Sequence, residues 1–247
     1  KGRSDPFFLY LPYNAPHFPI QPPDDWLERT KKAKPELSEG RAKNVAFIEH
    51  TDYHIGRVLD GLEASGLREN TLIVFSSDNG GAANYFQSNG KLRGAKQDHW
   101  EGGIRVPTCV SWPGHIRTGI VDTIGITMDF YPTLCDLAGI HVKHETDGVS
   151  LLPFLMRGDD SGLNDRTLFW VRREGGATGY QGRAYYAVRR GPWKLEQSTS
   201  FAPMELYNLD DDPLETTPLD DRKITAELGA ALMLHIQEVG KIPWQKK

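Results

Sequence analysis

Short apolar runs and one long amphipathic segment alternate over the first 140 residues. Residues 7–11 and 72–75 are continuous apolar runs, a pattern typical of strands buried on both faces of a parallel sheet. Over 41–65, apolar residues recur at spacings of three, four and seven, which predicts an amphipathic helix. A third strand is predicted over 106–112 and a second helix over 128–138. This order of strands and helices predicts an α/β fold.

The pattern changes in the last third of the chain. Four short β-prone segments, separated by Gly, Pro and Ser, predict an antiparallel sheet, and one amphipathic helix is predicted over 224–239. Because that helix must cover its apolar face, we expect it to pack across the sheet. We therefore divide the chain into residues 1–160, part of an α/β domain, and 161–247, a small subdomain of antiparallel sheet and helix. The four β-prone segments are 167–173, 184–190, 193–196 and 205–209.

The composition excludes several classes of protein. The 247 residues contain 29 Lys and Arg against 33 Asp and Glu, a net charge of −4, whereas nucleic-acid-binding domains normally carry a basic excess. The longest apolar run, at 7–11, is far shorter than the roughly 20 residues that a membrane-spanning helix needs. Cys109 and Cys135 cannot build a disulfide framework and form no Cys-x-x-Cys metal motif. We therefore expect a folded protein with no nucleic-acid partner and no membrane span.

Asp78 and Asn79 are candidate metal ligands. They follow the predicted strand at 72–75 and offer hard oxygen ligands at its carboxyl end, where open α/β sheets place their binding sites. Gly80 and Gly81 come next and let the backbone turn sharply beside a bound group. An Asn-Gly turn without a ligand is the alternative, because such turns are common.

Two loop residues could meet an anion. His17 stands between two prolines shortly after the run at 7–11, where its ring could donate to an anion. Lys96 ends the stretch Leu-Arg-Gly-Ala-Lys, whose small residues could bring the ammonium group onto an oxyanion. An incidental loop His and a solvated Lys are the alternatives. Together with Asp78 and Asn79, these residues describe an oxyanion site that contains a divalent cation.

A second possible metal site lies on the predicted helix. His50 and His54 are four residues apart, a spacing at which two imidazoles can clamp zinc. No Glu follows His50 directly and no third ligand is evident, so two histidines without a metal is the favoured interpretation. Phosphate-loop, dinucleotide-binding and Gly-x-Ser-x-Gly motifs are absent from the sequence.

A series of motifs, in this order along nearly the whole chain, resembles the formylglycine-dependent sulfatases. The most specific is Glu-Gly-Gly-Ile-Arg-Val-Pro at 101–107, which follows Leu-Arg-Gly-Ala-Lys at 92–96. The resemblance implies an alkaline-phosphatase-like sheet with helices on both faces, incomplete in this chain, plus a small C-terminal antiparallel sheet and helix. The other motifs lie at 7–11, 16–19, 77–81, 112–114, 129–134, 147–152 and 206–213.

The resemblance also implies roles for the candidate residues. Asp78 and Asn79 match the family's Asp-Asn pair, which binds a calcium ion, while Lys96 and His17 match its sulfate-binding residues. A cation and fixed donors suit this chemistry, because charge in sulfate-ester cleavage spreads over the equatorial and leaving oxygens. His99 stands where many relatives carry a small or apolar residue, and an ordinary loop residue is favoured over a substrate contact. The implied substrate is a small-molecule or glycan sulfate ester, whose pocket residues 82–90 and 170–176 could border.

The sequence departs from the family at the nucleophile. That residue is a Cys or Ser, in a Cys/Ser-x-Pro-x-Arg motif, which is converted to formylglycine; neither Cys109, Cys135 nor any Ser fits. The early Asp-Asp pair that completes the calcium site is absent as well. Because the chain opens without Met directly before an apolar run, we expect a preceding N-terminal half that carries the formylglycine and the other ligands. This chain by itself is therefore expected to be inactive.

Two other functions remain open. A phosphodiesterase or phosphonate hydrolase of the same superfamily would share the metal chemistry, and the run at 101–107 is what favours a sulfatase. A non-catalytic binding protein could have kept the fold and lost the nucleophile. Export to the periplasm, the lysosome or the cell exterior is implied by the family alone.

Overall fold

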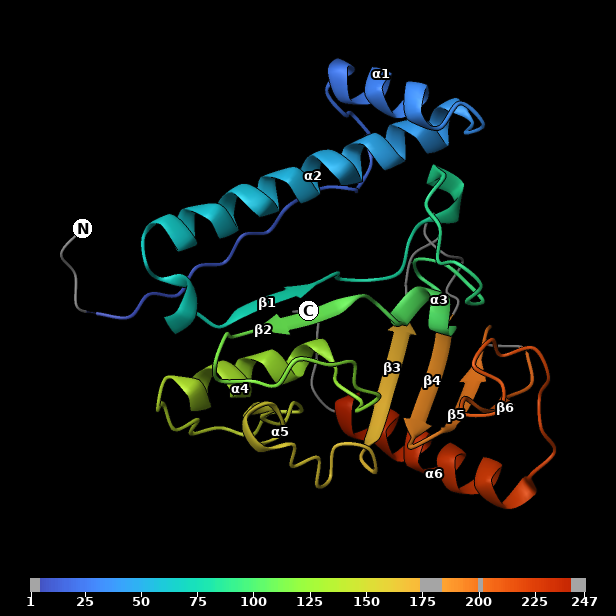
Figure 1. Cartoon of the computed structure of the whole chain (residues 1–247). Coiled ribbons are helices and arrows are strands. Elements are labelled where there is room, and N and C mark those ends of the chain that lie inside the picture. Colours follow the sequence, from blue (N-terminus) through green and yellow to red (C-terminus); the bar gives the residue numbers. More distant parts are fainter. Residues whose placement is uncertain (1–4, 174–183, 200–201, 241–247) are drawn as a thin grey trace, which may run out of the picture. The chain divides into compact units, whose positions relative to one another are not determined.

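The computed structural model describes residues 5–173, 184–199 and 202–240 (Figure 1). The chain forms two compact units. The first unit comprises Lys1–Arg68 and Ala82–Gln87, and the second comprises Glu69–Gly81 and Ser88–Lys247. The expected division near residue 160 stays a prediction.

Two helices form the body of the first unit. Helix α2 spans Glu39–Ala64 and confirms the helix predicted over 41–65; the Ser38 side chain caps its start by accepting a hydrogen bond from the Arg41 amide. Helix α1, Asp24–Ala33, packs against α2 and was missed by the sequence analysis. Its buried residue, Thr30, donates to Glu49 of α2 at 2.9 Å, so a polar contact replaces the apolar periodicity that would have indicated a helix.

The short helix η2, Ala83–Tyr85, completes the first unit. Asn44, fully buried on α2, donates its side-chain amide to the carbonyl of Tyr85 at 2.6 Å, and Arg41 donates to the carbonyl of Phe86 at 3.0 Å. Gly40 lies so close to the Phe86 ring that a Cβ atom would stand 2.5 Å from it. Two segments far apart in sequence are therefore joined tightly within this unit.

The strand predicted at residues 7–11 is wrong for this structure. These residues are extended but unpaired among the described residues, and Phe8 and Tyr10 are 75% and 74% exposed. A strand exists through its hydrogen-bonded neighbours, and an apolar run supplies none by itself.

A two-stranded sheet opens the second unit. Strand β1, Ile73–Ser76, follows the short helix η1, Arg68–Asn70, and pairs antiparallel with β2, Thr108–Ser111. Both strands were predicted, but the parallel arrangement buried on both faces is wrong for this pair, in which Phe75 is 47% exposed. An apolar run indicates a strand without fixing the direction of its neighbour.

The second unit also contains four helices, of which one precedes β2 and three lie between β2 and β3 in the sequence. They are α3 at Glu101–Ile104, η3 at Thr127–Asp129, α4 at Phe130–Leu137 and α5 at Leu152–Arg157. The predicted helix over 128–138 is confirmed by η3 and α4. Asp129 is fully buried; it forms a salt bridge with Arg166 and accepts a hydrogen bond from the amide of Val149 at 3.0 Å. This carboxylate therefore fixes the connections around α4.

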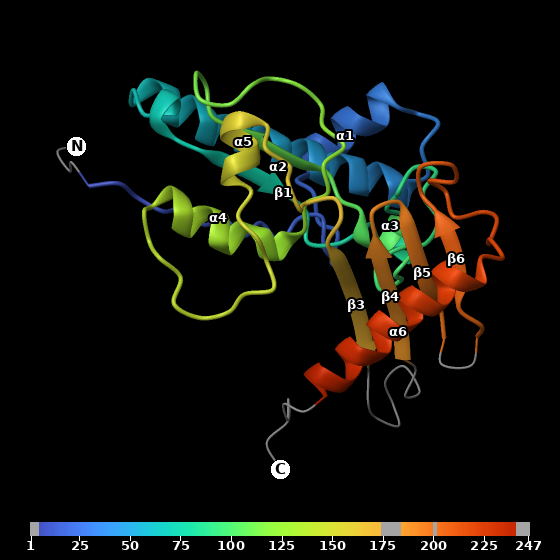
Figure 2. The ribbon, with the colours of Figure 1, turned by 90° about the horizontal axis from the view of Figure 1, so that it is seen from below.

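The C-terminal sheet has the order β3-β4-β5-β6 with every neighbouring pair antiparallel, as predicted. Helix α6, Arg222–Val239, crosses one face of it, which confirms the predicted packing (Figure 2). The buried residues of that face are Val188, Leu195 and Leu206, which pack on Leu228 and Leu232 of α6. The strands are β3 at Thr167–Arg173, β4 at Ala184–Arg190, β5 at Trp193–Gln197 and β6 at Glu205–Asn208.

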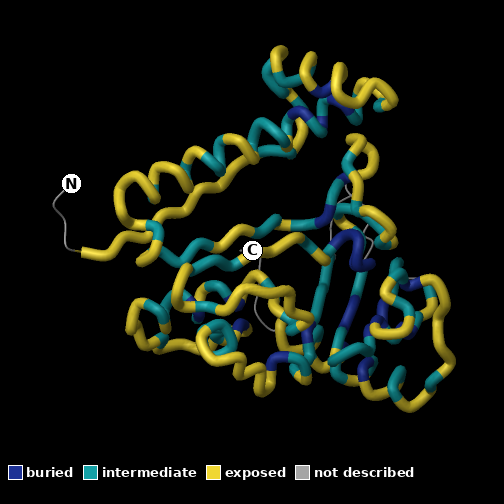
Figure 3. Tube along the Cα trace, in the orientation of Figure 1, coloured by how far each residue is buried: buried dark blue, intermediate teal, exposed yellow. Residues whose placement is uncertain are grey.

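The opposite face of this sheet is polar yet largely buried. Side chains alternate along a strand, so Lys194 and Glu196 of β5 point away from Leu195, and both are at most 2% exposed. Figure 3 shows buried residues in α3 and in strand β4. The segment that contains α3 packs on this polar face through the charged contacts described below.

Candidate functional site

Asp78 and Asn79 lie just past the carboxyl end of β1, separated from it only by Ser77, as predicted. Asp78 is exposed and Asn79 is half-buried. The Asn79 side chain donates a hydrogen bond from Nδ2 to the carbonyl of Gly80 at 2.8 Å. Because the nitrogen makes this bond, the side-chain oxygen Oδ1 is the atom that could bind a metal ion. The Gly80 amide donates to Gly103 at 2.9 Å, and a Cβ atom on Gly80 would lie 1.8 Å from the carbonyl oxygen of Gly102. Glycine is required here by the close approach of two backbones.

Lys96 lies beside the same turn. Its backbone amide donates to the carbonyl of Gly81 at 2.9 Å, three residues after Asp78. The Asn89 side chain clamps the two segments: it accepts from the Gly81 amide at 2.6 Å and donates to the carbonyls of Gly81 and Gly94, both at 3.1 Å. The structure therefore brings the backbones of Asp78, Asn79 and Lys96 together.

His17 belongs to the first unit, so the convergence of all four candidates on one pocket stays a prediction. His17 is exposed, and its Nδ1 lies 2.8 Å from the carbonyl of Phe18, to which it can only donate. The loop is fixed within the first unit, because Gln87 donates to the carbonyl of Pro16 at 2.7 Å and the Phe18 and Tyr85 rings stack 4.8 Å apart. Nε2 of His17 is left for another partner.

The two glycines of the Glu-Gly-Gly motif let the Lys96 loop fold tightly. The Gly102 amide donates to the carbonyl of Arg93 at 2.7 Å, and a Cβ atom on Gly102 would lie 2.5 Å from that oxygen. A Cβ on Gly103 would lie 2.2 Å from the carbonyl oxygen of Asp98. The side chain of Asp98 in turn accepts from the Ala95 amide at 2.8 Å. The motif is therefore a packing requirement of the loop that carries Lys96.

A buried cluster of charges anchors this loop to the C-terminal sheet. Lys194, fully buried, forms salt bridges with Glu101 at 3.0 Å and Glu215 at 2.7 Å. Glu215 also accepts from the Glu101 amide at 2.7 Å. Burial raises the pKa of Glu215 above its usual value, although the Lys194 ammonium opposes that rise. Two carboxylates around one ammonium ion are stable here because each is paired and hydrogen-bonded.

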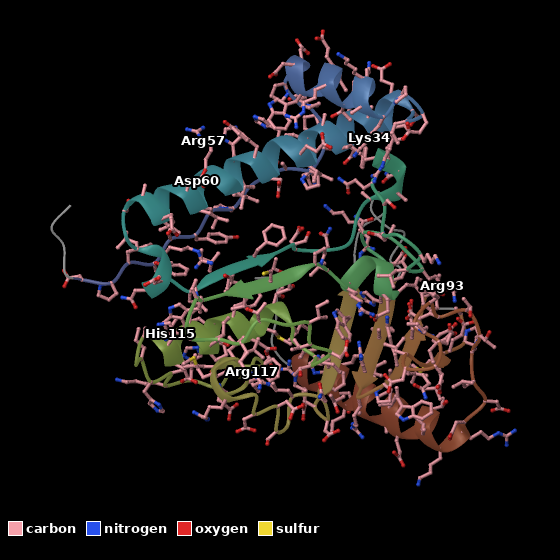
Figure 4. The ribbon with its side chains drawn as sticks, viewed as in Figure 1. Lys34, Arg57, Asp60, Arg93, His115 and Arg117 are labelled. Carbon is pink, nitrogen blue, oxygen red and sulfur yellow. The ribbon has the colours of Figure 1, made fainter. Side chains whose placement is uncertain are left out.

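Arg93 makes a second anchor on the same face. Its guanidinium lies 3.6 Å from the centroid of the Trp100 ring and donates to the Tyr207 hydroxyl at 3.2 Å and the Glu215 carbonyl at 2.7 Å. The Tyr207 hydroxyl donates to Glu205 at 2.8 Å. Burial raises the pKa of Tyr207 well above its usual value, so the phenol stays protonated. Figure 4 shows Arg93 at the end of the sheet near α3.

Arg172 makes a third anchor, directly beside Lys96. Its Nη1 donates to the carbonyl of Gln97 at 2.6 Å, and Gln97 has a φ of 85°, in the region that favours glycine. His99, two residues after Gln97, is 7% exposed, and its ring packs edge to face with the ring of Tyr185. Burial, and then the charges of Lys194 and Arg172, lower the pKa of His99 to about 4. His99 is therefore a neutral, buried residue of this loop, and its expected lack of a substrate contact stays a prediction.

Sequence reasoning missed Lys194, Glu215, Arg93 and the anchoring role of Arg172. Only Lys194 had a signal, because it lies at an inward position between Trp193 and Leu195, where a charged residue needs a buried partner. Nothing in the sequence points to Glu215, which lies 114 residues from Glu101 and has a positive φ of 55°.

The metal site is incomplete within the part of the chain that the structure describes. No group of three or more His, Cys, Asp or Glu there could hold a metal ion. Asp78 and Asn79 provide the oxygen chemistry that calcium prefers, but calcium takes about six to eight ligands.

A cavity of about 260 Å³ lies between residues 149–153 and 159–163, and none of the candidate residues lines it. No described helix is long and apolar enough to cross a membrane.

Two family models match the sequence. The model described as "Sulfatase" matches residues 1–140, which is more than half of the chain, and the model "N-sulphoglucosamine sulphohydrolase, C-terminal" matches residues 95–241.

Curated relatives are similar over most of this chain but only over part of their own length. A protein named "Sulfatase" from Formosa agariphila is 36% identical over 89% of the chain and 43% of its own length. The N-acetylgalactosamine-6-sulfatase of Homo sapiens is 32% identical over 85% of the chain and 41% of its own length. The chain therefore spans less than half the length of these relatives.

Solved structures of related enzymes superimpose on most of this chain. The crystal structure of Ps i-CgsB in complex with k-i-k-neocarrahexaose superimposes with a TM-score of 0.81 at 29% identity, over 98% of this chain and 51% of that one. A phosphonate monoester hydrolase of Agrobacterium radiobacter superimposes with a TM-score of 0.61 at 25% identity, over 82% of this chain and 42% of that one. These likenesses confirm the expected alkaline-phosphatase-like sulfatase fold.

Proposed function

Because the chain belongs to the sulfatase family, we propose that it is the C-terminal part of a sulfuric-ester hydrolase. In this proposal Asp78 and Asn79 are metal ligands, and Lys96 and His17 hold the sulfate group. The observation that carries it is the hydrogen bond from the Lys96 amide to Gly81, which holds the Lys96 backbone beside the Asp78-Asn79 turn. A solvated surface lysine would need neither this bond nor the anchored loop around it.

Lys96 would act as a fixed cation. Its loop is held by Asn89, by the glycines of the Glu-Gly-Gly motif and by the buried charges beneath it, so little reorganisation is needed when the sulfate arrives. His17 would present Nε2, because Nδ1 is engaged with Phe18. In its protonated form, that ring would donate a second hydrogen bond to the sulfate.

Two groups outside this chain belong to the proposal. A calcium ion on Asp78 and Asn79 would withdraw charge from the sulfate oxygens, and the preceding N-terminal half would supply the other ligands. That half would also supply the formylglycine, since neither Cys109 nor Cys135 stands in the required motif. The whole protein would be exported from the cytoplasm, as the family resemblance implies.

We propose a sulfated glycan as the substrate class. The support is that one similar structure is a complex with k-i-k-neocarrahexaose and that one similar protein is an N-acetylgalactosamine-6-sulfatase. The phosphonate hydrolase is the second candidate, supported by the structural likeness to that enzyme over four fifths of the chain.

The test is a sulfatase assay on a version extended upstream. The gene is read for an in-frame Cys/Ser-x-Pro-x-Arg, and the extended protein is co-expressed with the formylglycine-generating enzyme and assayed with calcium against an aryl sulfate, a sulfated oligosaccharide and a phosphonate monoester. We expect sulfate-ester hydrolysis, with Lys96→Ala reducing kcat/KM by about a hundred-fold or more.

Lys91→Ala is the matched control, because Lys91 is an exposed lysine five residues before Lys96. It should keep full activity. Preference for the phosphonate would select the second candidate, and an extended protein without the motif and without turnover would indicate a non-catalytic binding protein. If the 247-residue chain alone turned over, the assignment of the nucleophile to another segment would be wrong.

A further inference from the structure

His50 and His54 form a close pair on α2 and are not among the residues of the proposed sulfate site. The two residues are one turn apart, and their Nε2 atoms lie 3.0 Å from each other. Their rings meet edge to face with centroids 4.5 Å apart, so the two Nε2 atoms converge while the rings avoid stacking. Both residues are half-buried, so neither is enclosed in the core of the first unit.

The separation of these nitrogens fits two neighbouring ligands of one metal ion. Metal–imidazole bonds are about 2.0–2.1 Å long, so two nitrogens 3.0 Å apart subtend an angle of roughly 95° at a shared metal. A tetrahedral zinc site would place them roughly 3.4 Å apart. The observed spacing, which is also that of a hydrogen bond between the two rings, allows both nitrogens to become neighbouring ligands of one ion. Two protein ligands are too few for a typical zinc site, whereas Cu²⁺ and Ni²⁺ accept imidazole pairs in square-planar or octahedral sites completed by water.

We propose that His50 and His54 bind one Ni²⁺- or Cu²⁺-type ion through their Nε2 atoms, with water in the remaining positions. The neighbours restrict the rings: Trp26 of α1 lies edge-on to His50, with centroids 5.4 Å apart, and Tyr53 lies edge-on to His54 at 5.3 Å. Because both histidines are on one rigid helix, the second nitrogen meets the metal at high effective concentration once the first has bound it.

Arg57 works against this site. Its Nη1 lies 3.4 Å from Nδ1 of His54, and because a guanidinium can only donate, that Nδ1 accepts and the ring proton of neutral His54 lies on Nε2. Metal binding needs the opposite tautomer, with the proton on Nδ1. The ion must therefore displace Arg57, which projects from α2 in Figure 4 and can swing into solvent.

The site does not rest on the proposed function. Imidazole nitrogens select transition metals, whereas calcium takes oxygen ligands, so the two ions would not compete for the same residues. If the sulfatase reaction proved not to require calcium, the proposed metal site at His50 and His54 would be unaffected. If this pair proved not to bind a metal ion, the proposed sulfatase function would be unaffected.

The experiment is a Ni²⁺ titration of the 247-residue chain by isothermal titration calorimetry in a non-chelating buffer. Ni²⁺ is used first because exposed Cys109 could reduce Cu²⁺. We expect one tight site, which His50→Ala and His54→Ala each weaken by about ten-fold or more because the chelate is lost. His115→Ala is the control, since His115 belongs to the second unit, where it stacks on Trp112, and the change should leave binding unchanged. Circular dichroism confirms that each variant stays helical.

Arg57→Ala gives the sharper test, because it should tighten Ni²⁺ binding several-fold. Lys43→Ala removes an equal charge from the same helix at a residue paired with Glu39, and should change binding less. A hundred-fold excess of Ca²⁺ should not displace Ni²⁺. Unchanged affinity in both histidine variants, or tighter binding of Zn²⁺ than of Ni²⁺, would overturn the proposal.

Discussion

The two faces of the C-terminal sheet are built on different principles. On one face, Val188, Leu195 and Leu206 pack against α6 and lose apolar surface to the interior. On the other face, Lys194, Glu196 and Tyr207 are equally buried but polar. Lys194 and Tyr207 hold the loop that carries Lys96, through a salt bridge with Glu101 and a hydrogen bond from Arg93. The apolar face therefore stabilises the subdomain, while the polar face fixes the position of a distant loop. Non-directional burial tolerates small shifts, and paired charges do not.

The largest expected effect comes from removing the shared ammonium of the polar face. Lys194→Met keeps the length of the side chain but leaves Glu215 buried without a cation and Glu101 with only Arg189, at 3.8 Å. This change should lower the free energy of unfolding by about 3–5 kcal/mol. Urea denaturation measures it. Lys223→Met, at an exposed position in the first turn of α6, is the control and should change stability little. A loss below about 1 kcal/mol would mean that the buried charges do not depend on one another.

The matching change on the apolar face is Leu195→Ala. The cavity beneath α6 should lower the free energy of unfolding by about 2–5 kcal/mol. Hydrogen exchange separates the two faces. In Leu195→Ala, the amide of Lys96 should exchange no faster than the amides of β4. In Lys194→Met, the amide of Lys96 should exchange faster than the amides of β4. Equal behaviour in both variants would break the distinction between the faces.

The pH dependence of stability should come partly from the polar face. Burial raises the pKa of Glu196 from its usual 4.5 to about 9, and the Lys194 ammonium opposes the rise. The folded protein then holds a proton that the unfolded chain releases, so stability is greatest below about pH 4.5 for this group and falls as the pH rises toward 9.

Glu196→Gln should remove this fall, because the amide has the shape of the protonated acid and does not ionise. We expect denaturant midpoints to vary less between pH 5 and 9, by an amount on the order of a few kcal/mol in the free energy of unfolding. Glu227→Gln, on the exposed side of α6, should leave the slope unchanged. An equally steep slope in Glu196→Gln would mean that Glu196 is ionised in the folded protein.

The smallest expected effect concerns Gln97. Arg172→Ala removes the hydrogen bond to the carbonyl of Gln97. Gln97 has a positive φ, which costs a residue other than glycine about 1–2 kcal/mol, so without this bond the loop should open more often. We expect the amide hydrogen of Lys96 to exchange roughly five-fold faster. Gln97→Gly removes that strain, so the same Arg172 change should matter less in the double variant. Arg190→Ala, whose bond goes to Thr167, is the control. An undiminished effect in the double variant would show that Arg172 acts elsewhere.

The candidate site could be listed from the sequence but not assembled from it. Asp78, Asn79 and Lys96 were predicted from residue type and from a family resemblance, and the structure joins their backbones through Gly81. Of the anchors beneath them, Lys194 showed only an inward position on a strand and Glu215 showed no signal. Their pairing could not be predicted, because a buried salt bridge links positions that no local pattern relates. His17 lies in the other unit, and its place beside the other three stays a prediction.

The sequence by itself determined the helices and strands whose apolar residues repeat regularly. Helix α2, helix α6 and the four strands of the C-terminal sheet all lie within a few residues of their predicted bounds, because side-chain periodicity reports which face of an element is buried. Only the tertiary structure decided the antiparallel pairing of β1 with β2, the unpaired state of residues 7–11 and the burial of Lys194 between two carboxylates. Each of these depends on a partner far away in the sequence, and hydrogen bonds and ion pairs need a specific partner, whereas hydrophobic burial needs only a covered face.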